Sequence, residues 1–375
     1  MDTTTTAFRL AHAAGGAWSE MTEACLLQLA PLPQGLNLGF VYVTDALDSD
    51  LERITARLSE KTGIASWVGT IGFGICVTGR EYFDKPAMAV LVGAMPAGSF
   101  QLLPTVAKPG ETLPDAVRDW VGTHHPMLGV VHGDPRNGHL PAIIDSVSDD
   151  TESFLVGGLT ASRRRQHQIA GPLTDGGISG ILFAGDVPVT TGLSQGCSPI
   201  GPVHEITKCR DQVVMELDGK PAFALFRAEI GEVLARNLAR VGGYIHVALP
   251  IAGSDKADYL VRNLMGIDPE NGWLAVGERL KTGDKLMFVR RDGAAAMADL
   301  ERMVADVKRR IEGTPRAALY FSCVARGPNL FGKNSEELKA IETALGGVPL
   351  IGFFANGEIC NNRLYGYTGV LTVLG

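Results

Sequence analysis

The chain closes with PLIGFFANGEICNNRLYGYTGVLTVLG, residues 349–375, and this stretch shows how much of the sequence is built. It holds two apolar runs of strand length around a loop rich in Asn, Glu and Cys. The runs predict β-strands, because β-branched and aromatic residues favour that conformation. A loop that only reversed the chain would need little more than Asn-Gly. The extra polar residues therefore need an explanation other than chain reversal.

Two earlier segments follow the same plan. They begin at Ser66 and Ser153, and each has an apolar run, a small or polar stretch and a second apolar run ending at glycine. Before each copy the pattern predicts a strand and an amphipathic helix, and in the third copy Asn334 is the expected cap, with Glu337 three residues later. Self-similarity of this kind indicates a repeated unit of strand, helix, strand and hairpin.

This pattern predicts an α/β fold, with repeated strand–helix–strand–hairpin units forming mixed, largely antiparallel sheets flanked by helices. A purely parallel doubly wound sheet is excluded, because each copy ends in a hairpin instead of a crossover. We expect an N-terminal domain over residues 1–189 with two copies. A C-terminal domain over residues 190–375 then holds the third copy and a turn-rich linker segment.

Composition narrows the class of protein. The 375 residues carry a formal net charge of -7, which argues against a nucleic-acid surface. No apolar run reaches the roughly 18 residues that a membrane span needs, and the N-terminus lacks the pattern of a secretory signal. Six cysteines without a CxxC motif indicate reduced thiols. We expect a cytoplasmic protein that binds neither nucleic acid nor a membrane.

Candidate site residues gather in two loops of the third copy. They are Cys323, Arg326, Asn329, Asn356, Glu358 and Cys360. If the strands ending at Phe321 and Phe354 pair, both loops leave one edge of a sheet, where α/β proteins commonly bind ligands. Arg326 could hold an anionic group in a bidentate way, and Glu358 could meet an ammonium group or pair with Arg326. The loops therefore predict either a small-ligand pocket or a structural ion pair.

Other chemistry leaves weaker signals. A cysteine nucleophile needs a base within hydrogen-bond reach, and no local signature supplies one. His125, His132 and His139 lie among prolines and glycines, so we expect them in loops and at strand edges, without a metal site. Haem needs only one axial imidazole and stays open. The stretch GTIGFGICVTG, residues 69–79, lacks the GxGxxG order of a nucleotide loop.

The same motifs resemble a known family. PLIGFFANGEI is similar to the GFFxxGEI signature of the C-terminal FIST domain (F-box and intracellular signal transduction proteins), and FSCVARGPNLFG is similar to its upstream element. SPIGPVHEITKCRDQVVMELDGKPA resembles the segment that joins the two FIST domains. VGTIGFGI and VGGLTAS resemble N-terminal FIST turns more loosely. The family motif falls on Cys323, Arg326, Gly327, Phe331, Gly352, Phe354, Gly357 and Glu358.

The resemblance implies a sensory module that binds a small polar ligand such as an amino acid. It also implies signalling through a separate partner protein, since the chain shows no kinase, cyclase or F-box segment. Some members are described as haem-based gas sensors, which makes haem an alternative cofactor. A cysteine-dependent enzyme acting on an amide or thioester is a further alternative. Residues 72–75 lack the glutamate that Glu358 supplies in the third copy, so we expect the working site there.

Overall fold

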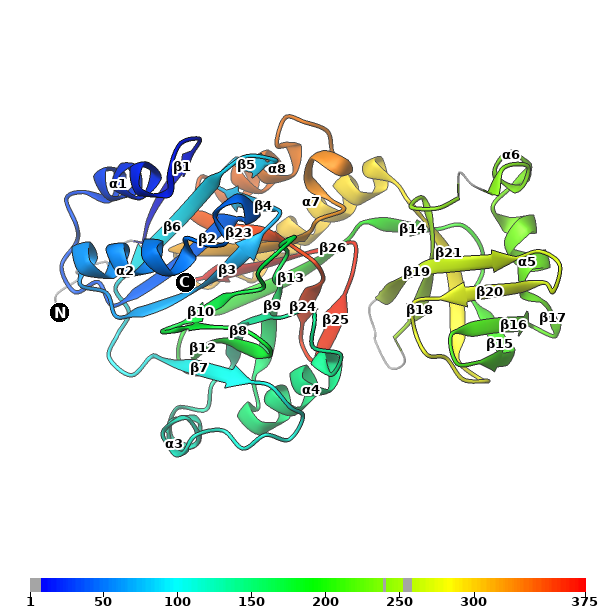
Figure 1. Ribbon diagram of the computed structural model, residues 1–375, viewed down its shortest axis with the longest axis horizontal. Coiled ribbons are helices and arrows are strands. Elements are labelled where there is room, and N and C mark those ends of the chain that lie inside the picture. Colours follow the sequence, from blue (N-terminus) through cyan, green and yellow to red (C-terminus); the bar gives the residue numbers. More distant parts are fainter. Residues whose placement is uncertain (1–7, 239–240, 252–257) are drawn as a thin grey trace. The chain divides into compact units, whose positions relative to one another are not determined.

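The computed structural model describes residues 8–238, 241–251 and 258–375, and the chain forms two compact units (Figure 1). Unit 1 comprises Met1–Ser194, Leu300–Leu364 and Thr368–Gly375, whereas unit 2 comprises Gln195–Asp299 and Tyr365–Tyr367. Unit 2 is therefore mainly an insertion, after which the chain returns to unit 1. The predicted domain boundary at residue 189 marks the end of the second sequence repeat and stays a prediction. The two units are instead defined by contacts between residues in space.

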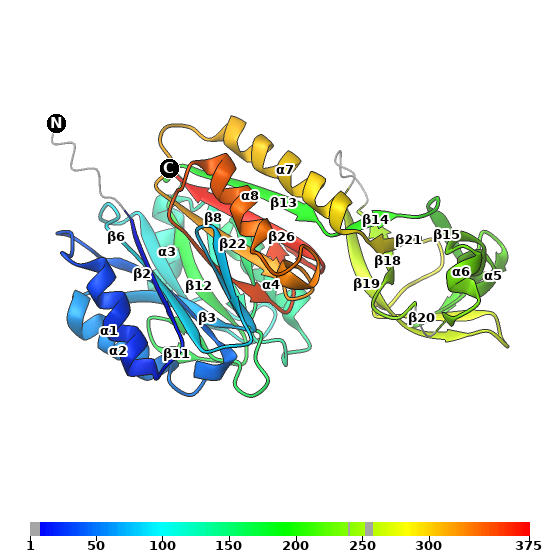
Figure 2. The same cartoon turned by 90° about the horizontal axis from the view of Figure 1, so that it is seen from above.

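Unit 1 contains three six-stranded sheets that share one strand order (Figures 1 and 2). The first sheet runs β1 (Arg9–Ala14), β6 (Ala87–Gly93), β2 (Leu38–Thr44), β3 (Ser66–Gly72), β10 (Gln168–Ala170), β11 (Leu173–Thr174). The second runs β7 (Phe100–Val106), β12 (Ile178–Phe183), β8 (Leu128–Gly133), β9 (Phe154–Leu159), β24 (Glu358–Cys360), β25 (Arg363–Tyr365). The third runs β13 (Val189–Gln195), β26 (Thr368–Leu374), β22 (Ala317–Cys323), β23 (Leu350–Ala355), β4 (Gly74–Val77), β5 (Arg80–Phe83).

Two long helices accompany each sheet. They are α1 (Trp18–Leu29) and α2 (Leu51–Thr62), α3 (Asp115–His124) and α4 (Leu140–Thr151), α7 (Gly293–Arg310) and α8 (Glu336–Leu345). In α2 the buried Ile54 and Leu58 lie on one face, and Gly63 ends the helix in the left-handed conformation that glycine adopts most easily. The expected cap at Asn334 is wrong, because α8 begins at Glu336 directly after Ser335.

The structure confirms the α/β class with mixed sheets flanked by helices. In each copy the strands on either side of a helix pair in parallel, as β2–β3, β8–β9 and β22–β23. The closing strand then pairs antiparallel with the free edge of the first, as β26 does with β22. The two apolar runs at the chain end are therefore separated by β22, and the hairpin of each copy lies within its loop, as in β4–β5. A crossover through a helix sets the second strand beside the first. The outer edge of the second strand is taken by a loop hairpin, so the closing strand pairs with the other edge of the first.

Each loop hairpin completes the sheet of a different copy. Strand β4 pairs with β23, β10 pairs with β3, and β24 pairs with β9. The exchange is cyclic, since each copy gives one hairpin and receives one. Residues 74–83 consequently find their sheet partner only when residues 350–355 are in place. The three copies form one folding unit for this reason.

One glycine in each sheet allows the paired strands to approach. A side chain at Gly69, Gly157 or Gly352 would place its Cβ 1.7–1.8 Å from a carbonyl oxygen of the preceding parallel strand. Such a distance lies far inside van der Waals contact, so only glycine fits these positions. The equivalent placement in three sheets makes these glycines a defining feature of the repeat.

Aromatic side chains from two copies and a histidine from the third meet inside unit 1. Tyr42 stacks on Phe353 with ring centroids 5.1 Å apart, and Phe321 meets both edge-on. The hydroxyl of Tyr42 lies 3.0 Å from Nε2 of His132, which is completely buried in β8. The expectation that His132 lies in a loop or at a strand edge is therefore wrong. Adjacent glycine and proline broke the helical pattern there but did not exclude a strand.

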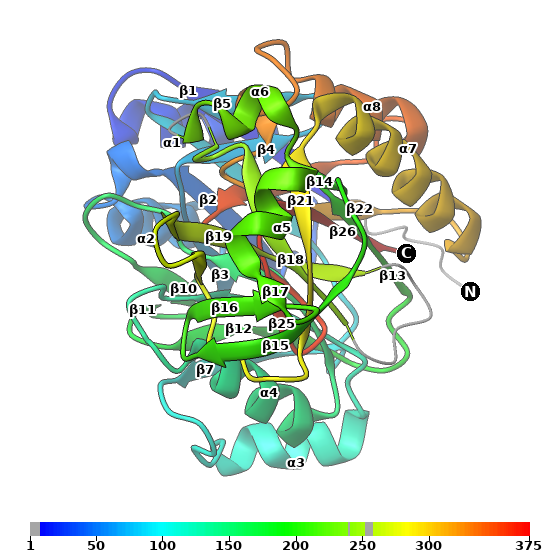
Figure 3. The same ribbon diagram turned by 90° about the vertical axis from the view of Figure 1, so that its right-hand side faces the viewer.

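Unit 2 is an antiparallel barrel of six strands with two further short strands outside the ring (Figure 3). Its strands are β14 (Cys197–Pro199), β21 (Lys285–Arg291), β15 (His204–Arg210), β16 (Val213–Leu217), β20 (Trp273–Val276), β19 (Tyr259–Asp268), β18 (Ile245–Pro250). Pairing of β18 with β21 closes the ring, and β17 (Lys220–Pro221) extends β16. Helix α5 (Ala222–Glu229) contributes Phe226 to the core, and α6 (Glu232–Ala235) follows. Closure pairs the strand edges that an open sheet would expose.

Among the residues that the structure describes, no helix is long and apolar enough to cross a membrane.

Candidate functional site

The two loops that carry the candidate residues leave the same edge of the third sheet. Strands β22 and β23 pair in parallel, with Cys323 opposite Ala355. The chain then continues on one side into residues 324–329 and on the other into the turn at Asn356 and Gly357. The prediction of a shared site required these two strands to pair, and the structure shows that they do.

Arg326 is fully buried and is held by an acidic partner that we did not expect. Its Nε donates to Oε1 of Glu337 at 2.8 Å, and its Nη2 donates to Oγ of Ser194 at 3.3 Å. The guanidinium lies over the ring of Phe331, 5.0 Å from the centroid. Its third nitrogen, Nη1, has no hydrogen-bond partner among the described residues. Burial opposes the charge, but Glu337 outweighs it and raises the pKa of Arg326.

Glu337 uses both carboxylate oxygens for structural contacts. Oε1 accepts from the hydroxyl of Tyr320 at 2.7 Å as well as from Arg326, and Oε2 accepts from the backbone N–H of Gly327 at 3.0 Å. The hydroxyl of Ser322 also donates to this carboxylate, 3.1 Å from Oε1. This carboxylate is fully occupied, so it positions Arg326 and is not free to meet a ligand.

Glu358 is equally buried but only half satisfied. Its Oε2 accepts from the backbone N–H of Thr368 at 3.1 Å and from the Thr368 hydroxyl at 2.8 Å. Its Oε1 has no hydrogen-bond partner among the described residues. Burial raises the pKa of Glu358 to about 8, and it is opposed by Thr368, Arg326 and a hydrogen bond from the Cys323 thiol. At neutral pH this carboxyl group is therefore mainly protonated, and it ionises as the pH rises through about 8.

Arg326 and Glu358 are close enough to interact electrostatically, yet they form no ion pair within 4.0 Å in the part of the chain that the structure describes. The direct pair considered from the sequence is therefore replaced by the pair of Arg326 with Glu337. Each of the two candidate side chains keeps one buried polar atom without a partner. This is the unusual property of the site, because buried polar groups are nearly always hydrogen-bonded.

The other four candidates divide into two kinds. Cys323 and Cys360 are buried, with 7% and 9% of their surface exposed, and Cys360 pairs with Val156 in the second sheet. Asn329 and Asn356 are exposed at the surface. The Asn329 amide donates to the carbonyl of Val324 at 2.9 Å and so shapes its own loop. The structure thus brings Cys323 to Arg326 and Glu358, and it leaves the asparagines facing solvent.

Comparison of the three sheets shows what is special about Glu358. It stands opposite Gly158, whereas the equivalent positions in the other loop hairpins are Gln168 and Ile75. Both ends of the Gln168 amide are used, because Oε1 accepts from Ser179 and Nε2 donates to a backbone carbonyl. Ile75 has no polar group. Only the third copy therefore presents an ionisable side chain with a spare oxygen at this position.

Sequence reasoning missed Glu337 as a partner of the site. The sequence predicts Glu337 as the residue three positions after a cap at Asn334, yet Glu337, Ile341 and Leu345 occupy one buried face of α8. An acidic residue four positions before an apolar one on such a face is the signal that could have found it. Thr368 carried no comparable signal, since its contact with Glu358 depends on how β26 returns.

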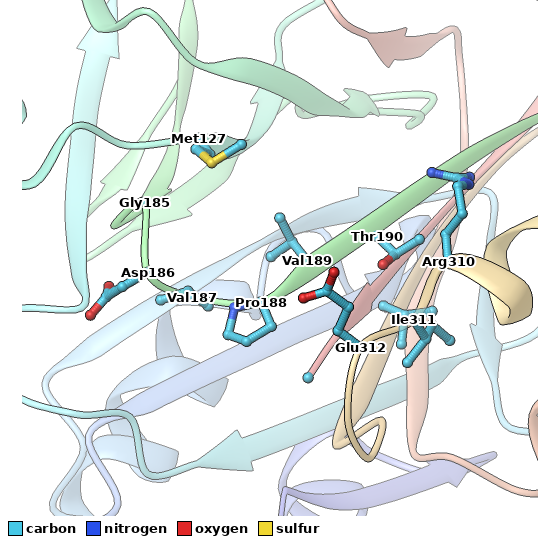
Figure 4. A pocket seen from close by; sticks show the side chains of 12 residues that line it. Met127, Gly185, Asp186, Val187, Pro188, Val189, Thr190, Arg310, Ile311 and Glu312 are labelled. Carbon is cyan, nitrogen blue, oxygen red and sulfur yellow. The ribbon is translucent and has the colours of Figure 1, made fainter.

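A pocket of about 320 Å³ lies elsewhere in unit 1 (Figure 4). Residues 185–190 and 310–312 form much of its wall, together with Met127. None of the six candidate residues lines it. Its Arg310 already donates to the carbonyl of Thr191 at 2.7 Å and pairs with Asp306. We therefore place the candidate site at Arg326 and Glu358.

These features define a class of protein: three cyclically interlocked α/β copies, one of which carries a buried polar site, with a barrel inserted into the chain. The model of the FIST N domain matches residues 37–220, and that of the FIST C domain matches residues 222–361. The chain belongs to the FIST family, as its motifs predicted. FIST domains are associated with signal transduction.

Relatives of similar length occur in mycobacteria. The chain is 31% identical over 338 residues to "Uncharacterized protein Rv0628c" of Mycobacterium tuberculosis (strain ATCC 25618 / H37Rv), which covers 82% of this chain and 83% of that protein. It is 31% identical over 327 residues to "Uncharacterized protein Mb0898c" of Mycobacterium bovis (strain ATCC BAA-935 / AF2122/97), with 82% of each chain covered. Both alignments therefore span more than four fifths of each chain.

Proposed function

We propose that this FIST protein is a sensor that binds a small amino-acid-like molecule at Arg326 and Glu358 and signals through a separate partner protein. The observation that supports this most directly is the pair of unused polar atoms, Nη1 of Arg326 and Oε1 of Glu358. An anionic group of the ligand would accept a hydrogen bond from Nη1 of Arg326. An ammonium group would donate to Oε1 of Glu358 and would favour the ionised form of this carboxyl group. A ligand with both groups offsets the cost of leaving each atom buried and unpaired.

The rest of the site is suited to a rigid receptor. Glu337 fixes the guanidinium of Arg326 from one side, and Thr368 fixes the carboxyl group of Glu358 with two hydrogen bonds. Side chains held in this way lose little additional freedom when a ligand binds. The copies that carry Gln168 and Ile75 lack an equivalent spare group, which supports a single site per chain.

The test is a thermal-shift screen of the purified full chain against the individual protein amino acids. At least one should raise the Tm of the wild type by several degrees, and Glu358→Gln should abolish that rise, because it removes the charge but keeps an acceptor for Thr368. Glu336→Gln is the matched control, since this neighbouring side chain on α8 is 46% exposed and lies outside the site. An equal rise in the wild type and Glu358→Gln would refute the site, and so would no rise with any amino acid.

The cysteine enzyme has one observation in its favour. The Cys323 thiol is among the groups that oppose the rise in the pKa of Glu358, so it lies near a carboxyl group that could act as a base. Iodoacetamide labelling of Cys323, followed by mass spectrometry of the peptide across pH, tests this candidate. Labelling faster than that of an unfolded thiol, and slowed by Glu358→Gln, would support it. Slow labelling that is the same in both proteins would count against it.

Haem rests on the family resemblance alone. Three histidines are buried, and each has another environment: His132 contacts Tyr42, His204 lies between two carboxylates, and His246 lies tilted against Tyr367 with ring centroids 4.3 Å apart. None of these contacts indicates an axial ligand, so haem binding stays a prediction. An absorbance spectrum after haem titration decides it.

A further inference from the structure

Unit 2 has a pocket of its own, of about 400 Å³. Apolar side chains of Ile200, Ile230 and Leu234 form part of its wall, and Glu229 and Arg290 supply charged groups. The lining therefore combines apolar side chains with charged groups that could orient a small molecule. All of these residues belong to the barrel and its helices, so the pocket is separate from Arg326 and Glu358.

A buried histidine holds Glu229 in place. Nε2 of His204 lies 2.6 Å from Oε1 of Glu229, and Nδ1 lies 2.6 Å from Oδ2 of Asp218. A neutral imidazole has one N–H and could donate to only one carboxylate, whereas an imidazolium donates to both. Burial opposes the charge, but the hydrogen bonds to Asp218 and Glu229 outweigh it and raise the pKa of His204. The two contacts lock the Glu229 side chain without using its second oxygen.

That second oxygen, Oε2 of Glu229, is buried and has no hydrogen-bond partner among the described residues. It lies against the backbone of Gly201, where a Cβ atom would come within 2.0 Å of it. Glycine at position 201 is therefore required for the carboxylate to take this position. A buried acceptor in such a place stabilises the protein only when a donor reaches it.

We propose that this pocket of unit 2 binds an organic ammonium ion with a short apolar body, whose N–H donates to Oε2 of Glu229. The charges around Glu229 favour a cation, because the His204 imidazolium that contacts it is shared with Asp218, and Lys220 acts on Asp218. The positive charge of Arg290 is already balanced, because its Nη2 lies 3.5 Å from Oδ2 of Asp292. Tyr244, which is 42% exposed, lines the pocket with an aromatic ring of the kind that attracts ammonium groups.

Saturation-transfer NMR on the full chain with isoamylamine as the probe tests this proposal. Isoamyl alcohol has the same carbon skeleton without the charge and is the matched probe. We expect clear transfer to the amine and about tenfold weaker binding of the alcohol, which corresponds to the loss of one charge-assisted hydrogen bond. Equal transfer to amine and alcohol, or none to the amine, would overturn the proposal.

Two variants locate the site and one serves as control. Glu229→Gln removes the charge but keeps an acceptor for His204, and it should weaken amine binding about tenfold. Leu234→Trp should block the pocket without touching the polar groups, which decides the question if Glu229→Gln does not fold. Glu232→Gln on the same helix segment has an exposed side chain and should bind like the wild type. Unchanged amine binding in Leu234→Trp, or in folded Glu229→Gln, would overturn the assignment.

Discussion

Nε of Arg326 lies 2.8 Å from Oε1 of Glu337, and neither side chain is exposed to solvent. The pair joins the loop after β22 to helix α8, and the backbone N–H of Gly327 and the hydroxyl of Tyr320 complete the carboxylate. Such a pair adds little net stability compared with apolar residues of the same size, but breaking it leaves a buried charge uncompensated. It therefore orients the guanidinium that the proposed ligand would meet.

Replacement of Glu337 by glutamine should destabilise the protein by about 3–5 kcal/mol, because Arg326 would remain charged in a buried environment. Urea unfolding monitored by tryptophan fluorescence measures the change. Glu336→Gln removes the same charge from a side chain that is 46% exposed, so its effect should stay within about 0.5 kcal/mol. Similar values for the two variants would contradict a structural role for the buried pair.

The pH dependence of stability should reveal Glu358. Burial raises its pKa to about 8 in the folded protein from the ordinary value of 4.5, so between these values the folded state binds more protons than the unfolded state. Stability therefore falls as pH rises through this window, by roughly 1.4 kcal/mol per pH unit. Glu81, whose pKa burial also raises to about 8, titrates in the same window.

Glu358→Gln isolates one of these two groups. The variant should lose the contribution of Glu358 and show a shallower fall in stability between about pH 5 and pH 8, while Glu81 still titrates. Unfolding measured at several pH values in both proteins gives the difference. Two curves of equal slope would mean that Glu358 is not a buried carboxyl of raised pKa.

The contact of Tyr42 with His132 offers a test of the interior of unit 1. Tyr42→Phe should cost about 1–3 kcal/mol, because it leaves Nε2 of His132 buried without a partner, and Nδ1 already has none among the described residues. Adding His132→Phe should recover part of this loss, since the third sheet has Phe321 at the equivalent position. Chemical denaturation of both variants measures the free energy of unfolding. A double variant less stable than Tyr42→Phe would argue against an unpaired Nε2 of His132 as the cause of the loss.

The close-approach glycines should tolerate no side chain. Gly352→Ala would set Cβ 1.7 Å from the carbonyl oxygen of Tyr320, and Gly69→Ala would meet Val41 in the same way, so neither variant should fold. Gly122→Ala is the control, because nothing lies within 4 Å of its added Cβ in helix α3. It should be neutral or stabilising by about 0.5–1 kcal/mol. Circular dichroism of purified proteins distinguishes these outcomes.

Local sequence determined the elements of the repeat. Apolar runs bounded by glycine specified strands, and the spacing of Ile54 and Leu58 specified a helix, because backbone propensity and the burial of one face act within a few residues. The same pattern indicated that the third copy differs from the other two in carrying Glu358. The family motifs also pointed to Arg326 and Cys323, which the fold brings to the edge that holds Glu358.

Tertiary structure alone decided how these elements are joined. The cyclic exchange of loop hairpins, which pairs Glu358 with Gly158, has no local signature, because strand pairing depends on which edges remain free after each crossover forms. The partner of Arg326 was decided in the same way, by the packing of α8 over β22. Burial then left Nη1 of Arg326 and Oε1 of Glu358 without partners, and a sequence cannot record this, since satisfaction of a polar atom depends on every neighbour in space.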